Sequence, residues 1–290
     1  MTRRTESLIE FLDNSPSTYH VIANLAGELE HQGYTWLEPG DSWQLQAGGK
    51  YYTTKGGSTL IAFRIPEGTP AGFMISASHA DRPGLKVKEN GELTGKYTRL
   101  AVEKYGGLIM STWLDRPLSI AGRVLVETEK GVQSKLLNID RDLLLIPNVA
   151  IHMNRKINEG YSWNPAVDLL PLAGGKNAAG KFNELLEEAA GGKILGRDLF
   201  LYNRQKASVW GLEEEFLSAA ALDDLAYSID VLCERFGLTP SGGRSQYELH
   251  TDWDTSLIES TTEAFMQMQT LHGARLVSGP EMRQWVMGGT

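Results

Sequence analysis

Apolar residues near the N-terminus recur at helical spacing and predict two amphipathic helices. The first ends at the Ser15-Pro16-Ser17 break, which offers a cap for the next helix. The second is expected over residues 18–32, with Gly33 as its stop. We expect both helices to cover a sheet. The residues of the two apolar faces are Leu8, Ile9 and Leu12 in the first helix, and Val21, Ile22, Leu25 and Leu29 in the second.

Shorter apolar segments follow and predict strands. Residues 50–54 and 58–64 flank Gly56-Gly57 in the manner of a hairpin. The apolar run Ala71 to Ile75 predicts a buried strand that leads into the segment Ser76 to Leu85.

The pattern changes between about residues 89 and 211 to short β-like pieces separated by Gly- and Asn-bearing turns, which predicts an inserted, mostly β module. One helix interrupts this module at about residues 181–190, between Gly-rich segments. A further helix, residues 222–236, is expected to return the chain to the first layer, and residues 238–290 carry one possible helix at 256–271. Examples of the β-like pieces are Leu118–Glu127, Leu143–Ile146, Ala150–Met153 and Leu199–Tyr202.

Composition narrows the classes of function. The 290 residues carry a net charge of −8 without a basic cluster, which argues against nucleic acid and anionic membranes as partners. Cys233 is the single cysteine, so a bound metal must be held by histidines and carboxylates. The sequence shows neither a signal peptide nor a membrane-spanning apolar run, and we therefore expect a cytoplasmic protein.

His79 and Asp81 are the first candidates for chemistry, because they follow the predicted strand where open α/β sheets build their sites. Residues i and i+2 of an extended segment point the same way, so Asp81 could hold one ring nitrogen of His79 while the other binds a metal. The alternative is a solvated loop with ordinary turn chemistry at Pro83-Gly84.

Four segments together resemble the aspartyl aminopeptidase family. They are SASHADRPGLKVKEN (76–90), YGGLIMSTWLDRPLSIAGRV (105–124), LLIPNVAIHMNRKIN (144–158) and AALDDLA (220–226), in the order of the family. The resemblance implies a zinc-exopeptidase-like α/β catalytic domain with an inserted β-rich dimerisation domain, and hence a homo-oligomer. On that pattern residues 1–90 form the first part of the catalytic domain, 91–212 the insert, and 213–290 a second part that diverges after about residue 235.

The resemblance also implies roles for individual residues. His79 matches a zinc ligand, and Asp81 matches the catalytic-site acid that orients it. Asp223 matches the aspartate of an Arg-Leu-Asp-Asn motif that bridges two zinc ions, although Ala221 replaces the arginine here. A helix cap is the structural alternative for Asp223. His152 matches a histidine that reaches an active site, often that of a neighbouring subunit, as metal ligand or substrate contact; the alternative is a hydrogen-bonded interface histidine. Zinc is the metal implied, and His and carboxylate ligands also serve cobalt and manganese.

The implied function is removal of N-terminal acidic residues, Asp or Glu, from peptides by two zinc ions and a glutamate base. The family carries that base in an Asn-Glu-Glu-Val-Gly motif, and no Glu-Glu pair follows Asp223 in this sequence. The sequence is therefore compatible with a truncated or frame-shifted member, a fragment, or a lineage that lost catalysis. The rival hypothesis is a non-catalytic oligomerising protein that keeps the insert.

Overall fold

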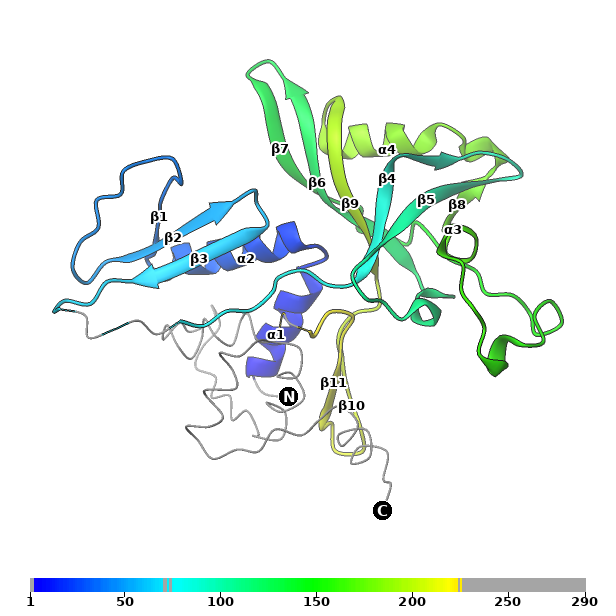
Figure 1. Cartoon of the computed structure of the whole chain (residues 1–290), viewed down its shortest axis with the longest axis horizontal. Coiled ribbons are helices and arrows are strands. Elements are labelled where there is room, and N and C mark those ends of the chain that lie inside the picture. Colours follow the sequence, from blue (N-terminus) through cyan, green and yellow to red (C-terminus); the bar gives the residue numbers. More distant parts are fainter. Residues whose placement is uncertain (1–2, 70–71, 73–74, 224, 226–290) are drawn as a thin grey trace.

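The computed structural model describes residues 3–69, 72, 75–223 and 225 (Figure 1). Helices α1 (Arg3–Asp13) and α2 (Thr18–His31) come first, as their apolar spacing predicts. The predicted stripe of α2 is buried, and the helix ends before Gly33, whose φ of 79° is left-handed. A residue without Cβ adopts that conformation at little cost, which explains the stop.

A small sheet packs beside these helices in the order β1-β2-β3. Its strands are β1 (Thr35–Trp36), β2 (Lys50–Lys55) and β3 (Thr59–Arg64). The hairpin of β2 and β3 turns through Gly56, Gly57 and Ser58, between the paired Lys55 and Thr59. Gly56 and Gly57 have φ values of 62° and 68°, which glycine adopts at little cost. Helices α1 and α2, strand β2 and the distant Ala221 and Leu225 share one hydrophobic core.

A larger antiparallel sheet has the order β7-β6-β9-β4-β5-β8. Its central pairing, between β6 and β9, runs from Leu118↔Asn203 to Val126↔Ile194. A separate pair of short strands, β10 (Ser208–Trp210) and β11 (Phe216–Ser218), follows it in the chain. The strands of the larger sheet are β4 (Gly84–Leu93), β5 (Tyr97–Tyr105), β6 (Leu118–Thr128), β7 (Gly131–Asn138), β8 (Leu172–Gly175) and β9 (Ile194–Asn203).

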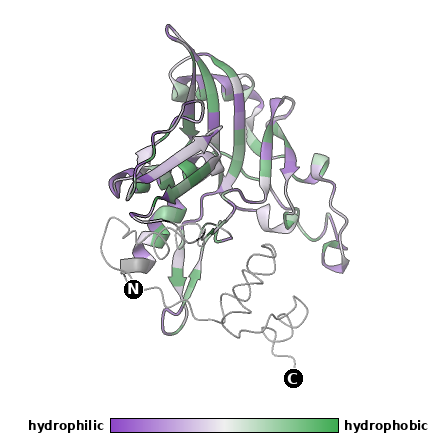
Figure 2. Cartoon of the chain, turned by 60° about the vertical axis from the view of Figure 1, so that its left-hand side comes forward, coloured by the Kyte–Doolittle hydropathy of each residue, from purple (hydrophilic) through white to green (hydrophobic). Residues whose placement is uncertain are grey.

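The second hydrophobic core lies between this sheet and helix α4 (Lys181–Ala190). Phe182, Leu186 and Ala190 are the buried face of α4, and Gly191 ends the helix in a left-handed conformation. Hydrophobic residues colour the central strands in Figure 2, in keeping with this core. The remaining short helices are α3 (Pro165–Asp168), η1 (Met110–Trp113), η2 (Ile157–Glu159) and η3 (Lys176–Ala178).

Three predicted strands differ in the structure. Of Ala71–Ile75, only Gly72 and Ile75 are described; neither is in a strand, and Ile75 is 85% exposed. Ala150–Met153 is a loop with a turn, because its apolar residues face outward and pair with no neighbouring strand among the described residues. Leu143–Ile146 makes only isolated bridges, such as Leu144 with Leu118.

Part of the prediction lies outside the described residues. This holds for the helix expected at 222–236, apart from its first residues, and for the one expected at 256–271. The three-part domain division stays a prediction, and β4 spans its first boundary at residue 90. Among the described helices, none combines the length and hydropathy that crossing a membrane requires.

Candidate metal centre

The imidazole of His79 lies between two carboxylates that sequence reasoning had singled out. Its Nε2 is 3.1 Å from Oδ1 of Asp223, which is 144 residues away in the chain. Its Nδ1 is 2.9 Å from the backbone oxygen of Asp81 and 3.5 Å from Oδ1 of the same residue. The structure thus brings His79, Asp81 and Asp223 together, with both ring nitrogens of the histidine directed at them.

Two contacts with the junction of α1 and α2 hold the irregular segment that carries His79. The Thr18 hydroxyl, in the first turn of α2, donates to the backbone oxygen of Ala80 at 2.7 Å. The Arg82 guanidinium donates to the backbone oxygen of Pro16. One of these hydrogen bonds runs from the helix to the segment and the other from the segment to the helix junction, and together they fix the backbone around His79.

Asp223 is positioned by its neighbours in the first core. Ala221 and Leu225 are buried there, at 7% and 0% exposure, while the Asp223 side chain between them is 68% exposed. The alternation of buried and exposed residues directs the carboxylate outward toward His79. The side chains of His79 and Asp81 are 38% and 45% exposed, so the centre is open to solvent.

The distance between the two candidate ligand atoms fits a pair of neighbouring ligands of a tetrahedral zinc ion. Two ligands about 2.0–2.1 Å from a tetrahedral zinc stand roughly 3.3 Å apart, and His79 Nε2 and Asp223 Oδ1 are 3.1 Å apart. Imidazole nitrogen and carboxylate oxygen are donors that zinc accepts, and a second-sphere partner on Nδ1 is typical of zinc-bound histidine. Within the described part of the chain, no group of three or more such side chains is placed to hold a metal.

Tyr105 is a member of the site that sequence reasoning missed. Its hydroxyl donates to Oδ2 of Asp81 at 2.6 Å, and this hydrogen bond raises the pKa of Tyr105, with burial and the Asp81 charge adding to the shift. The phenol therefore keeps its proton at neutral pH. No local sequence pattern separates a tyrosine that ends a strand from one that contacts a site.

Other predicted residues lie elsewhere. His152 is exposed in the turn Ile151–Met153, and Figure 1 shows that green loop at the far right, away from α1 and α2. A role in a neighbouring subunit stays a prediction. The adjacent Asp115 and Arg116 have separate partners: Asp115 accepts from the backbone N–H of Asn148, and Arg116 donates to Gln205. Asp115 has a left-handed backbone conformation, with φ 56°. Trp113 packs partly buried against the second core.

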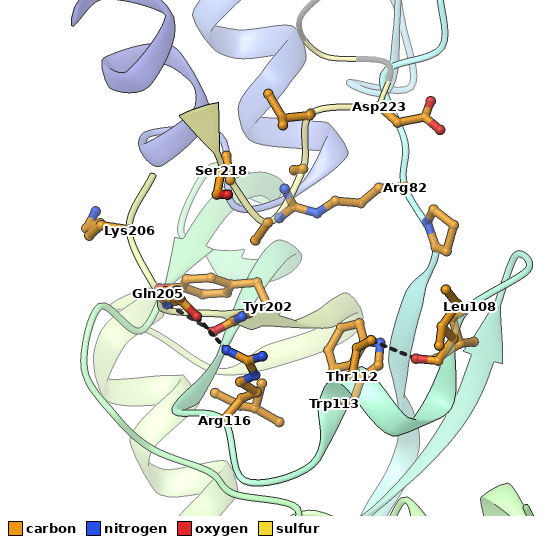
Figure 3. A pocket seen from close by; sticks show the side chains of 18 of the residues that line it. Arg82, Leu108, Thr112, Trp113, Arg116, Tyr202, Gln205, Lys206, Ser218 and Asp223 are labelled. Carbon is orange, nitrogen blue, oxygen red and sulfur yellow. Dashed lines mark hydrogen bonds between the residues drawn. The ribbon is translucent and has the colours of Figure 1, made fainter. Parts of the chain in front are cut away.

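A cavity of about 650 Å³ adjoins the centre. Figure 3 shows Asp223 at its edge with the carboxylate directed away from Arg82, whose side chain points inward. Arg82, Arg116 and Lys206 line the cavity, and Asp223 is the single acidic residue among its described lining. Burial lowers the pKa of Arg82 to about 10, still well above neutrality, so Arg82 is charged. Lys206 pairs with Asp13 at 3.7 Å, which leaves Arg82 and Arg116 as the cations that give the lining its positive charge.

Comparison with known proteins assigns the family. Residues 11–233 match the model of the aminopeptidase I zinc metalloproteases, M18. The chain belongs to the M18 family. Among curated relatives, "Probable M18 family aminopeptidase 2" of Clostridium acetobutylicum is 41% identical over 233 residues, which are 76% of this chain and 54% of the relative. The chain thus spans about half the length of the curated relatives it matches.

Solved M18 structures confirm the fold class. "Cryo-EM structure of the Ape4 and Nbr1 complex" contains a chain with a TM-score of 0.73 and 32% identity, covering 78% of this chain and 49% of that one. "Structure of S. cerevesiae mApe1 dodecamer" gives a TM-score of 0.63 and 25% identity, covering 78% and 56%. The predicted resemblance is therefore confirmed, and zinc is the metal that the M18 description names.

Proposed function

We propose that this protein is a zinc-dependent M18 aminopeptidase that removes N-terminal acidic residues from peptides. The observation that carries the proposal is the 3.1 Å approach of His79 Nε2 to Asp223 Oδ1, across 144 residues of sequence. A chance surface pair is a weak explanation, since Thr18 and Arg82 hold one segment and the first core holds the other.

Each residue has a distinct part in this proposal. His79 and Asp223 hold zinc, and Asp81 fixes the imidazole so that Nε2 faces the metal. Bound zinc supplies Lewis acidity toward a carbonyl and an activated water. His152 is proposed to act at a neighbouring subunit through the β-rich insert, as metal ligand or substrate contact. Zinc is proposed as a pair of ions, in line with the bridging role inferred for Asp223; cobalt or manganese could take the same ligands.

The preference for acidic residues is supported by charge. A cavity beside Asp223 that carries Arg82, Arg116 and Lys206 attracts a carboxylate side chain and disfavours a cationic one. On this basis, Arg116→Gln should reduce cleavage of peptides with N-terminal Asp more than cleavage of peptides with N-terminal Leu. Equal losses on both peptides would contradict the proposed pocket.

The direct test is incubation of the full chain with zinc and peptides that begin with Asp or Glu, with release of the free amino acid measured by chromatography. Zinc-dependent release that is abolished by His79→Gln is the expected result. His31→Gln, at an exposed histidine of α2, is the matched control and should retain release. Release that persists in His79→Gln would contradict the role of the candidate centre.

A second function is favoured by a specific observation. No Glu-Glu pair follows Asp223 in the sequence, and the described residues supply no third metal ligand to the centre. A non-catalytic protein that assembles through its insert accounts for both, and one solved relative is titled a dodecamer. Light scattering joined to the peptide assay separates the two: homo-oligomers without release support this alternative, and homo-oligomers with release support the enzyme.

A further inference from the structure

Tyr105 connects the larger sheet to the candidate metal centre. It is the last residue of β5 and pairs with Gly84, the first residue of β4, so the sheet ends three residues after Asp81. Its hydroxyl donates to Asp81 Oδ2 at 2.6 Å. Its ring packs edge-on against Phe200 of β9, with centroids 5.5 Å apart and planes at 78°. The side chain is therefore held at both its ring and its hydroxyl.

We propose that Tyr105 is a positioning residue for zinc binding, because it fixes the Asp81 carboxylate that orients His79. This inference rests on the proposed function. On this proposal the larger sheet, and not only the helical part of the chain, helps to position the residues of the metal site.

The argument follows from the two oxygens of Asp81. Oδ2 accepts from Tyr105, while Oδ1 lies 3.5 Å from His79 Nδ1. The Asp81 side chain is 45% exposed, so without the phenol its carboxylate can rotate toward water. His79 then keeps the backbone oxygen of Asp81 as a partner on Nδ1 and loses the nearby negative charge. Loss of such a partner weakens metal binding even when both ligands are intact.

The ring of Tyr105 belongs to a further chain of contacts. Lys86 Nζ lies 5.8 Å from the centroid of Phe200 on which Tyr105 packs, and it pairs with Asp198 at 3.0 Å. The position of the phenol is thus set by β4 and β9 together. A purely structural role for Tyr105 would depend on this ring packing, whereas the positioning role depends on the hydroxyl.

Substitution of Tyr105→Phe separates the two roles, since it removes the hydroxyl and keeps the ring. Zinc affinity of the full chain is measured by competition with a chromophoric chelator, for the natural protein, Tyr105→Phe, and the control Tyr97→Phe. Tyr97 lies on the same strand and is 59% exposed. We expect zinc to bind Tyr105→Phe about tenfold more weakly, as for other second-sphere changes, and Tyr97→Phe to match the natural protein.

A second variant and a metal-free measurement complete the test. Phe200→Leu removes the ring contact and keeps the phenol, so it should weaken zinc less than Tyr105→Phe; the reverse order would overturn the proposal. Binding of zinc by Tyr105→Phe within twofold of the natural protein would also overturn it, while leaving the proposed function standing. Amide hydrogen exchange of residues 76–82 without metal reports the ordering of the segment: we expect faster exchange in Tyr105→Phe, and unchanged exchange would overturn the proposal. If the natural protein binds no zinc, the proposed function and this inference both fail.

Discussion

At the scale of single residues, His20 gives the fold a dependence on pH. It is partly buried in α2 and hydrogen-bonds Ser17 Oγ at 2.8 Å; burial, aided by the charge of Arg82, lowers its pKa from 6.5 to about 4. His20 takes up a proton near pH 6.5 in the unfolded chain and only near pH 4 in the folded chain. The stabilisation that this difference provides is therefore complete above pH 6.5, and it is lost as the pH falls from 6.5 to 4. We expect His20→Gln to reduce this loss by roughly 1–2 kcal/mol, after allowance for partial exposure.

The measurement is urea unfolding at several pH values in this window. His31→Gln, at an exposed histidine of the same helix, should keep the pH dependence of the natural protein. If His20→Gln loses as much stability on acidification as the natural protein, other groups control the pH dependence.

Residue identity also explains how much of the site could be predicted. A local spacing and a family motif pointed to His79, Asp81 and Asp223, and the structure brings these three residues together. Their roles as ligands and orienting acid stay predictions. Tyr105 could not be found in this way, since its contact with Asp81 depends on the pairing of β4 with β5. Arg82 was missed for a similar reason: its role as a cation of the cavity depends on segments from four parts of the chain.

At the scale of elements, helices and hairpins were predicted well because their signals are local. Periodic apolar stripes and Gly stops define α2 and α4, and Gly56-Gly57 defines the turn between β2 and β3. Strands whose evidence was only a short apolar run failed at Ala150–Met153, since an apolar run does not reveal whether a partner strand is available. Met153, for instance, is 79% exposed.

Substitution of Gly122, in β6, tests how closely the central strands β6 and β9 approach each other. A Cβ at this position would lie 2.0 Å from the backbone oxygen of Asp198 in β9. Because backbone cannot move aside as a flexible side chain does, Gly122→Ala should lower the free energy of unfolding by about 1–3 kcal/mol. Gly27→Ala is the control: nothing lies within 4 Å of its added Cβ, and at this exposed position of α2 it should stabilise by about 0.5–1 kcal/mol. Urea unfolding measures both, and a neutral Gly122→Ala would contradict the close approach.

At the scale of the whole molecule, the two hydrophobic cores are joined by a polar cluster around Asp198. Its carboxylate accepts from Lys86 Nζ at 3.0 Å, Arg123 Nη2 at 2.7 Å and Tyr19 Oη at 3.1 Å. Tyr19 belongs to α2, while the other three residues belong to the larger sheet. Arg123 also donates to the backbone oxygen of Gly56 in the hairpin turn and lies over the Tyr19 ring at 4.7 Å. The helical part and the sheet are thereby held in one arrangement, which includes the approach of Tyr105 to Asp81.

Removal of the Asp198 charge should loosen this junction. Burial acts to raise the pKa of Asp198, but the hydrogen bonds from Arg123 and Lys86 outweigh it and the pKa is lowered. The carboxylate therefore stabilises the fold above its unfolded pKa, near 3.8, and that stability is lost as pH falls through the lower folded pKa.

We expect Asp198→Asn to cost about 1–3 kcal/mol at pH 7, because two cations are left partly buried without their acceptor. Asp142→Asn is the matched control: Asp142 also pairs with an arginine, at 2.6 Å, but is 70% exposed, so its loss should cost under about 1 kcal/mol. Urea unfolding of both variants checks the difference, and equal costs would show that the cluster does not join the two cores. A loss of zinc affinity in Asp198→Asn, alongside the loss of stability, would further show that the junction supports the metal centre.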